Sequence, residues 1–370
     1  MKLLIQPGDG IGALVKAINK AKKTVEIVIF RFDLAEVEHA LESAVERGVF
    51  VHALIASINR GGEKNLRKLE MRLLASGVTV ARTADDLIRY HGKMAIIDRK
   101  ELFLLAFNFT HLDTERSRSF GLITKNPTLV QEAVKLFDAD TKRQTYSAGS
   151  PKFLVSPVNA RKQLAKFIKG AKKELLIYDL KISDRGLVRL LEERAKSGVS
   201  VRIIGHMARK SNLADVRELS RLRLHARSII RDRTQAFLGS QSLRQLELDA
   251  RREIGIIFRD GKAISAMVRT FEEDWKTART NVKAVAAELE EPVAHAAKKV
   301  AKAVSKQLPV APVLEQVVKD VVANRIDVDI DHEEVVDTVK DAVKDAVRDA
   351  VEDTFKNVVT KVAEEAGTGK

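Results

Sequence analysis

Two spacings of apolar residues alternate along the first 280 residues of the chain. Apolar positions three and four residues apart are typical of amphipathic helices, whereas short continuous apolar runs are typical of buried strands. In the first half this pattern predicts helices at 11–22, 34–47, 63–75 and 127–141, and strands at 24–30, 49–55, 78–81, 91–98, 102–107 and 120–124. Such alternation is typical of helices packed on a largely buried, mixed sheet, so we expect an α/β fold.

The same order of elements recurs after residues 145–151, a linker of small residues. The second half predicts helices at 161–169 and 186–196, strands at 175–180, 199–205, 236–238 and 254–258, and a final helix through Phe271 and Trp275. A lone large aromatic residue on a helix of this kind is most simply a core residue. We therefore expect Trp275 to be buried.

The two halves are also related residue by residue. The tripeptide Ala21-Lys22-Lys23 recurs as Ala171-Lys172-Lys173 at an offset of 150, whereas His91 matches His225 at an offset of 134. The pattern predicts two duplicated repeats, at 1–145 and 152–285. The first repeat holds 16 more residues, somewhere in 56–89, and we interpret this extra piece as a candidate lid or substrate loop.

Beyond about residue 281 the composition changes to alanine, valine, lysine and glutamate. We expect residues 286–370 to form a helical C-terminal extension, in which 335–363 is the longest helix, with partial disorder as the alternative. Valine recurs every four residues from Val339 to Val351, so an apolar stripe drifts slowly around the predicted helix. Self-association or docking on the rest of the chain is favoured over membrane contact, because a lipid-binding helix usually carries large apolar residues over a basic face.

Charge and composition narrow the classes of partner. The last 85 residues hold 12 Lys/Arg and 18 Asp/Glu, which leaves 53 basic and 33 acidic residues, or +20, for the first 285. A body this basic favours a polyanion or an anionic membrane surface, and a solvated basic surface is the alternative. The absence of cysteine excludes disulfides, thiolate nucleophiles and Cys-bound zinc. No apolar stretch reaches the roughly 18 residues of a spanning helix, so a cytoplasmic location, peripheral to the membrane at most, is expected.

The candidate chemistry lies in a short motif that occurs once in each repeat. The two copies are His91-x-Lys93-x4-Asp98 and His225-x-Arg227-x4-Asp232. In an extended strand, side chains two positions apart share a face, so each histidine projects beside its cation. Because imidazole serves as nucleophile, acid or base near neutral pH, this arrangement predicts a phosphate site that contains a nucleophile.

The paired motifs resemble the HKD motifs of the phospholipase D superfamily, over roughly residues 1–285. The resemblance implies two similar α/β halves that face each other across a pseudo-twofold axis, with both motifs in one cleft. It also implies a covalent phosphohistidine, with His91 as the nucleophile and His225 as the acid and base, and no metal or other cofactor. Lys93 and Arg227 would neutralise the phosphate oxygens.

Further roles come from the same resemblance. Asp98 and Asp232 would each fix a histidine, which could be that of the opposite repeat. Glu253 could also orient a histidine. Asn108 and Ser240 could donate hydrogen bonds to the phosphate.

Each repeat departs from the family pattern. Arg227 replaces a lysine, and the wider guanidinium fork is not a neutral change at a tight phosphate site. Ser119 stands where the second repeat has Glu253, and Ser242 stands where the first has Asn108. A degenerate phosphate-binding relative is therefore an alternative to an active enzyme.

Three functions remain open. The leading one is a phospholipase D-like enzyme that hydrolyses phospholipids or transfers phosphatidyl groups, similar to cardiolipin synthases, although the N-terminal membrane helices usual in bacterial synthases are not seen. The second is a metal-independent nuclease, since the basic body suits nucleic acid, although 5% aromatic residues are too few for an extensive base-stacking platform. The third is a catalytically weak module that binds phosphate.

Overall fold

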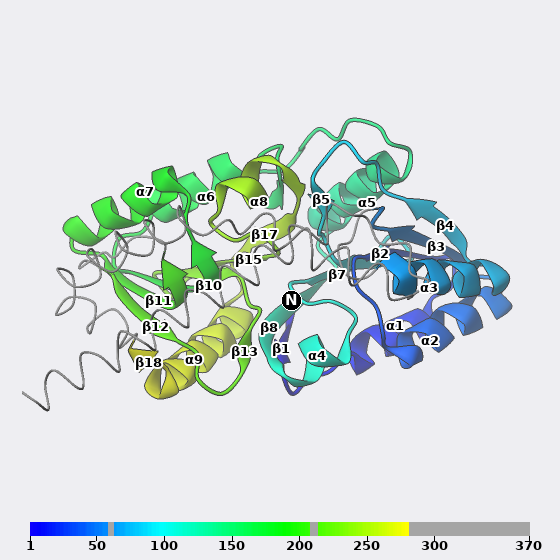
Figure 1. Cartoon of the computed structure of the whole chain (residues 1–370), viewed down its shortest axis with the longest axis horizontal. Helices are drawn as coiled ribbons and strands as arrows, with labels where there is room; N and C mark the ends of the chain where they lie inside the picture. The colour runs from blue at the N-terminus through cyan, green and yellow to red at the C-terminus, as the bar shows by residue number, and fades with distance from the viewer. Residues whose placement is uncertain (58–62, 208–213, 281–370) are drawn as a thin grey trace, which may run out of the picture. The chain divides into compact units, whose positions relative to one another are not determined.

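The computed structural model describes residues 1–57, 63–207 and 214–280 (Figure 1). These residues belong to one compact unit. The predicted C-terminal extension at 286–370, with its long helix at 335–363, lies outside the described residues.

The first repeat is built on a mixed sheet. Its strands, in spatial order, are β1 (Lys2–Gln6), β8 (Ser117–Thr124), β7 (Glu101–Leu105), β6 (Met94–Ile97), β2 (Thr24–Ile29), β3 (Phe50–Ile55) and β4 (Thr79–Arg82). Strands β2, β3 and β4 are parallel, and the pairs from β1 to β2 are antiparallel. The predicted mixed sheet is confirmed, although the pattern missed β1.

The second repeat has a sheet of the same design. Its strands, in spatial order, are β18 (Arg279–Thr280), β12 (Asp215–Glu218), β11 (Ser200–Met207), β10 (Glu174–Ile182), β14 (Ser228–Arg231), β15 (Gln235–Gly239), β17 (Ile254–Phe258) and β9 (Phe153–Val155). The register is preserved between the repeats, because Ile29 pairs with Ile55 in the first and Asp179 pairs with Gly205 in the second. Positions 150 residues apart are therefore structural equivalents in this part of the fold.

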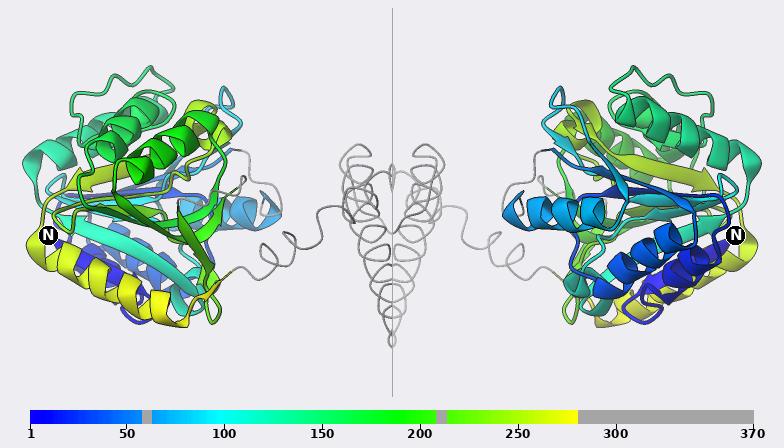
Figure 2. Two further views of the ribbon diagram at one scale, coloured as in Figure 1. Left: turned by 90° about the vertical axis from the view of Figure 1, so that its left-hand side faces the viewer. Right: turned by 90° about the vertical axis from the view of Figure 1, so that its right-hand side faces the viewer.

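Amphipathic helices cover the sheets. One hydrophobic cluster joins the first sheet to α1 (Gly12–Lys20), α2 (Ala35–Glu46) and α3 (Glu63–Ala75), and another joins the second sheet to α6 (Ala160–Lys169) and α7 (Arg185–Lys196). Two short helices, α4 (His111–Glu115) and α8 (Gln245–Asp249), follow β7 and β15. Seen from the side, the strands occupy a middle layer with helices on both sides of it (Figure 2).

The extra segment of the first repeat contains α3, which the sequence pattern predicts at the observed residues. Leu66, Leu69 and Leu73 of this helix are buried in the core of the repeat. Burial of each leucine stabilises the fold by about 1.5–3 kcal/mol. The interpretation of this segment as a lid or substrate loop is therefore wrong for α3, which is a fixed layer of the fold.

A third hydrophobic cluster joins the two repeats. It includes α5 (Pro127–Thr141) and α9 (Gly261–Thr277) and residues of both sheets. Tyr178 lies edge-on to Phe120 of the first repeat at 5.6 Å and to Phe271 at 5.1 Å, and Phe271 stacks on Trp275 at 5.5 Å. Trp275 is buried, as predicted. Because this core is continuous, the repeats pack as one body.

Two ion pairs cross between the repeats at equivalent positions. Arg118 of β8 donates to both carboxylate oxygens of Asp274 in α9, at 2.7 and 3.0 Å. Its counterpart Arg252 lies 3.0 Å from Asp140 in α5. All four side chains are at most 13% exposed, so water screens these pairs little. The pairs help to fix the repeats against each other.

Candidate active site

Two very short strand pairings bring the predicted histidines to the junction of the repeats. Strand β5 (Arg89–Tyr90) pairs with β16 (Arg251–Arg252) of the second repeat, and β13 (Arg223–Leu224) pairs with β8 of the first. The backbone N–H of His91 donates to the carbonyl of Arg252 at 2.7 Å, and that of His225 donates to the carbonyl of Arg118 at 3.0 Å. Each histidine is thus anchored on the opposite repeat.

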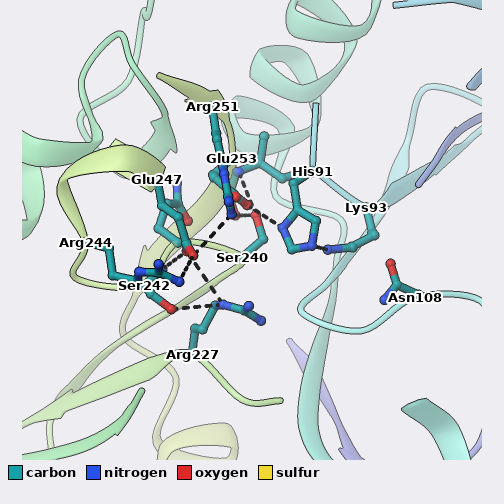
Figure 3. A network of polar contacts seen from close by, with 12 residues as sticks. His91, Lys93, Asn108, Arg227, Ser240, Ser242, Arg244, Glu247, Arg251 and Glu253 are labelled. Carbon is teal, nitrogen blue, oxygen red and sulfur yellow. Dashed lines mark hydrogen bonds and ion pairs between the residues drawn. The ribbon is translucent and has the colours of Figure 1, made fainter. Parts of the chain in front are cut away.

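His91 is held on both sides of its ring. Its Nδ1 lies 2.9 Å from a carboxylate oxygen of Glu253, and its Nε2 lies 2.8 Å from the ammonium of Lys93 (Figure 3). The edge-on ring of Phe30 lies 4.6 Å away, centroid to centroid. Since lysine supplies N–H donors to Nε2, these partners assign the imidazole proton to Nδ1, which donates to Glu253. The Nε2 lone pair then accepts a hydrogen from the ammonium of Lys93.

His225 is held less well. Its Nδ1 lies 3.4 Å from Asp113, and this nitrogen makes no hydrogen bond to any residue that the structure describes. The Asp113 carboxylate is shared, because it accepts the backbone and side-chain N–H of Asn108, both at 2.7 Å, and pairs with Arg223. Ser119 stands where a counterpart of Glu253 would lie. The two histidines are therefore not equivalent.

Arg227 supplies the second cation. Its Nε donates to the hydroxyl of Ser242 at 3.2 Å, and one of its terminal nitrogens donates to the carbonyl of His225 at 3.2 Å. Figure 3 shows Lys93 and Asn108 of the first repeat opposite Arg227 of the second. Asn108, Lys93 and Arg227 are buried, so an anion between them would be largely desolvated.

The charges of both repeats act on both histidines. Burial lowers the pKa of His91 well below its ordinary value, and the positive charges of Lys93 and Arg227 lower it further. Burial, Arg227 and Lys93, in that order, likewise lower the pKa of His225. Each imidazole is affected by the cation of the opposite repeat, so the motifs form one site, and these charges favour neutral rings.

The family model described as "Cardiolipin synthase, PLD-like domain" matches residues 14–141 and 164–275, which is more than half of the chain. The chain belongs to this phospholipase D-like family. The two matched segments lie one in each repeat. No curated protein matches the chain in sequence.

Solved structures show the same fold. A polyphosphate kinase from Porphyromonas gingivalis aligns with a TM-score of 0.63 and 18% identity, over 74% of this chain and 50% of that chain. A phosphatidylserine synthase from Haemophilus influenzae aligns with a TM-score of 0.57 and 11% identity, over 74% of this chain and 85% of that chain. The chain spans about half the length of the kinase. At these identities the likeness concerns the fold alone.

The phospholipase D-like site does not include the two aspartates of the motifs. Asp98 accepts the backbone N–H groups of Lys22, Lys23 and Thr24 at 2.6–3.0 Å, and Asp232 is bound in the same way by Lys172, Lys173 and Glu174. Burial acts to raise the pKa of both carboxyl groups, but the backbone N–H groups outweigh it and lower the pKa.

The interpretation of Asp98 and Asp232 as partners of a histidine is therefore wrong. Seven residues carry the chain across β6 or β14 to the far end of the strand, away from the histidine that precedes it. There the carboxylates tie the strand end to the start of β2 or β10. Their role is structural.

The remaining predicted residues lie at or beside the site. Glu253 contacts His91, and Asn108 contacts Asp113. Ser240 is buried and its hydroxyl is bonded to the backbone of Ile254, at 3.1 Å from the N–H and 3.3 Å from the carbonyl. These bonds occupy the hydroxyl, so they do not support the predicted hydrogen bond from Ser240 to a phosphate.

Sequence reasoning missed a pair of acidic residues. Asp113 follows Asn108 by five residues, and Glu247 follows Ser242 by five. Glu247 accepts the backbone N–H of Ser242 at 2.7 Å, as Asp113 does that of Asn108. The signal was available, because an acid at the same position of both repeats stands out once the repeats are aligned.

None of the helices that the structure describes has the length and apolar character needed to cross a bilayer. No group of three or more His, Cys, Asp or Glu side chains in the described ranges is arranged to hold a metal ion.

Anion binding at this site should weaken as the pH rises through neutrality. Burial lowers the pKa of Lys93, Glu253 acts to raise it and Arg227 acts to lower it, and the net result is a pKa of about 7. A bound anion stabilises the protonated lysine, so the affinity follows the protonated fraction. From a pKa of about 7, the affinity for sulfate, which does not titrate in this range, should fall roughly 30-fold between pH 6 and 8.5.

Calorimetric titration with sulfate measures this dependence. Lys93→Met keeps the size of the side chain, and it should bind sulfate weakly and with little change over the same range. A wild-type affinity that stays constant from pH 6 to 8.5 would contradict the prediction.

Proposed function

We propose that this chain is a phosphodiesterase of the phospholipase D type that acts on phospholipids, by hydrolysis or by phosphatidyl transfer, through a phosphohistidine at His91. The observation that carries the proposal is the setting of His91, whose Nδ1–H is held by Glu253 and whose Nε2 faces the buried cation of Lys93. A neutral imidazole with one nitrogen fixed and the other beside a cation is an activated nucleophile at an anion site.

In the first step, the ammonium of Lys93 turns from Nε2 of His91 to a non-bridging oxygen of the diester, and the freed Nε2 lone pair attacks phosphorus. The N–P bond forms while the bond from phosphorus to the leaving oxygen breaks, and protonated His225 gives its proton to that oxygen. Lys93, Arg227 and the free amide hydrogen of Asn108 neutralise the non-bridging oxygens. Glu253 stabilises the positive charge that develops on the His91 ring.

Burial and the cations around His225 lower the pKa of its ring and so favour the neutral form. A bound diester contributes a negative charge beside the ring and so acts to raise that pKa. Substrate binding thereby favours the protonated form that the first step needs.

In the second step, the oxygen of water or of an alcohol attacks phosphorus. Neutral His225 takes the proton from that oxygen, the N–P bond breaks, and both histidines return to their starting states. The double displacement avoids a direct attack of water on an anionic diester.

A lipid substrate is supported by three observations. The matching family model is named for cardiolipin synthase, and the fold is shared with a phosphatidylserine synthase. The excess of 20 positive charges in the first 285 residues also suits an anionic membrane surface.

The test is to incubate the purified chain in EDTA with phospholipid vesicles labelled at phosphorus and, separately, with labelled DNA and RNA. Covalent label from the lipid alone, with release of the head group, supports the proposal. Label from an oligonucleotide would instead support a nuclease. Neither label nor turnover with any diester would support a phosphate-binding module.

A further inference from the structure

A cavity of about 340 Å³ lies in the second repeat on the side of His225. Its lining includes the apolar side chains of Leu180, Leu222 and Leu224. Leu224 immediately precedes His225 in the chain. Arg223, which also lines the cavity, binds Asp113, the carboxylate nearest to the His225 ring. The cavity thus adjoins the surroundings of His225.

The duplication explains why there is space here. The position of Leu180 is occupied in the first repeat by Phe30, whose ring lies edge-on to His91. The position of Gly205 is occupied by Ile55, which is 1% exposed. Two large side chains that fill the first repeat are thus replaced by smaller ones in the second.

The backbone maintains this space. Gly205 has a φ of +144° and contributes to the cavity lining. A Cβ atom at this position would lie 1.7 Å from the carbonyl oxygen of Asp179 and 3.3 Å from Leu224. Only glycine fits here without a shift of the neighbouring strand.

We propose that this cavity binds the alcohol half of the reaction, as the leaving alcohol in the first step and as the accepting alcohol in the second. The inference rests on the proposed function, in which His225 gives a proton to the leaving oxygen and takes one from the attacking oxygen. The alcohol must then approach from the side of His225, where the cavity lies. Phe30 occupies the corresponding place beside His91.

The lining defines the chemical class of the alcohol. Leucine side chains suit a short carbon chain, and the half-exposed pair of His206 and Glu218 adds polar groups, with Nδ1 3.4 Å from the carboxylate. Arg223 is already paired with Asp113, so the cavity offers little net attraction to an anion. These features fit a neutral alcohol with a second hydroxyl group that donates to Glu218 or His206.

The experiment measures how the phosphatidyl group is partitioned between water and an added alcohol. Phosphatidylmethanol serves as donor, since its leaving group is too small to need the cavity, and 1,4-butanediol competes with water as acceptor. Leu222→Trp and Leu180→Phe fill the cavity, the latter with the residue type of the first repeat. Both should lower the ratio of transfer to hydrolysis at least tenfold, with hydrolysis and phosphohistidine labelling retained.

Ile88→Trp is the matched control. Ile88 is the counterpart of Leu222 in the first repeat, is 56% exposed and does not line this cavity. The Ile88→Trp variant should leave the ratio of transfer to hydrolysis unchanged. Ethanol as acceptor should show a smaller loss than butanediol in the cavity variants, because it fills less of the cavity.

The outcomes separate the two proposals. A wild-type chain that forms no phosphohistidine would overturn the proposed function itself. Normal labelling and hydrolysis with an unchanged ratio in both cavity variants would overturn only the assignment of the cavity. Circular dichroism and thermal unfolding establish whether each variant is folded. If either Leu222→Trp or Leu180→Phe does not fold, the other still tests the proposal.

Discussion

His91→Ala should abolish covalent labelling by a phosphodiester substrate, with a fall in turnover of at least about a thousandfold. The substitution removes the only imidazole whose Nδ1 is fixed by a carboxylate among the described residues at this site, and with it the Nε2 that attacks phosphorus. His225→Ala should leave slow but detectable labelling when the leaving group is good, because such a group departs without a proton. Mass spectrometry of the trapped protein locates the label.

His39→Ala provides the control for this pair. His39 lies on the exposed side of α2, away from the site, and its loss should change neither labelling nor turnover. The roles of the two histidines would be reversed if labelling survived in His91→Ala and vanished in His225→Ala.

Asp274→Ala should destabilise the fold by about 3–5 kcal/mol, the usual cost of removing one partner of a buried ion pair. The change leaves the guanidinium of Arg118 buried without its carboxylate and removes the acceptor of the Tyr178 hydroxyl, which donates to Asp274 at 2.6 Å. Denaturant unfolding followed by circular dichroism measures the effect. Lys125→Ala, which breaks the exposed pair with Glu101, should cost less than about 1 kcal/mol.

A double variant tests the cause. Replacing both Arg118 and Asp274 with apolar residues of similar size, as in Arg118→Met with Asp274→Leu, should recover part of the lost stability, because no charge is left unpaired. A single variant as stable as the wild type would mean that the pair does not help to join the repeats. Since the carbonyl of Arg118 accepts the N–H of His225, the single variant should also lower activity in the folded protein.

The repeats, most of their helices and strands, and the two cations and two histidines of the site can all be predicted from the amino-acid sequence. This information is local. A buried strand needs a short apolar run, and a covering helix needs an apolar stripe, so both can be read from neighbouring residues. Residues 63–75 illustrate this, because the pattern predicts the helix that the structure places there as α3. The duplication supplied the rest, since a motif that occurs twice at equivalent positions is stronger than a single one.

The partner of each histidine, by contrast, depends on contacts between residues that are far apart in the chain. Strands β5, β13 and β16 are two residues long, too short for any periodicity to reveal, yet they anchor both histidines on the opposite repeat. Glu253 meets His91 from 162 positions away, whereas Asp98, only seven positions away, lies at the far end of a strand. Separation along the chain does not measure distance in space once two repeats share a core. The contacts that distinguish His91 from His225 therefore depend on how the repeats pack.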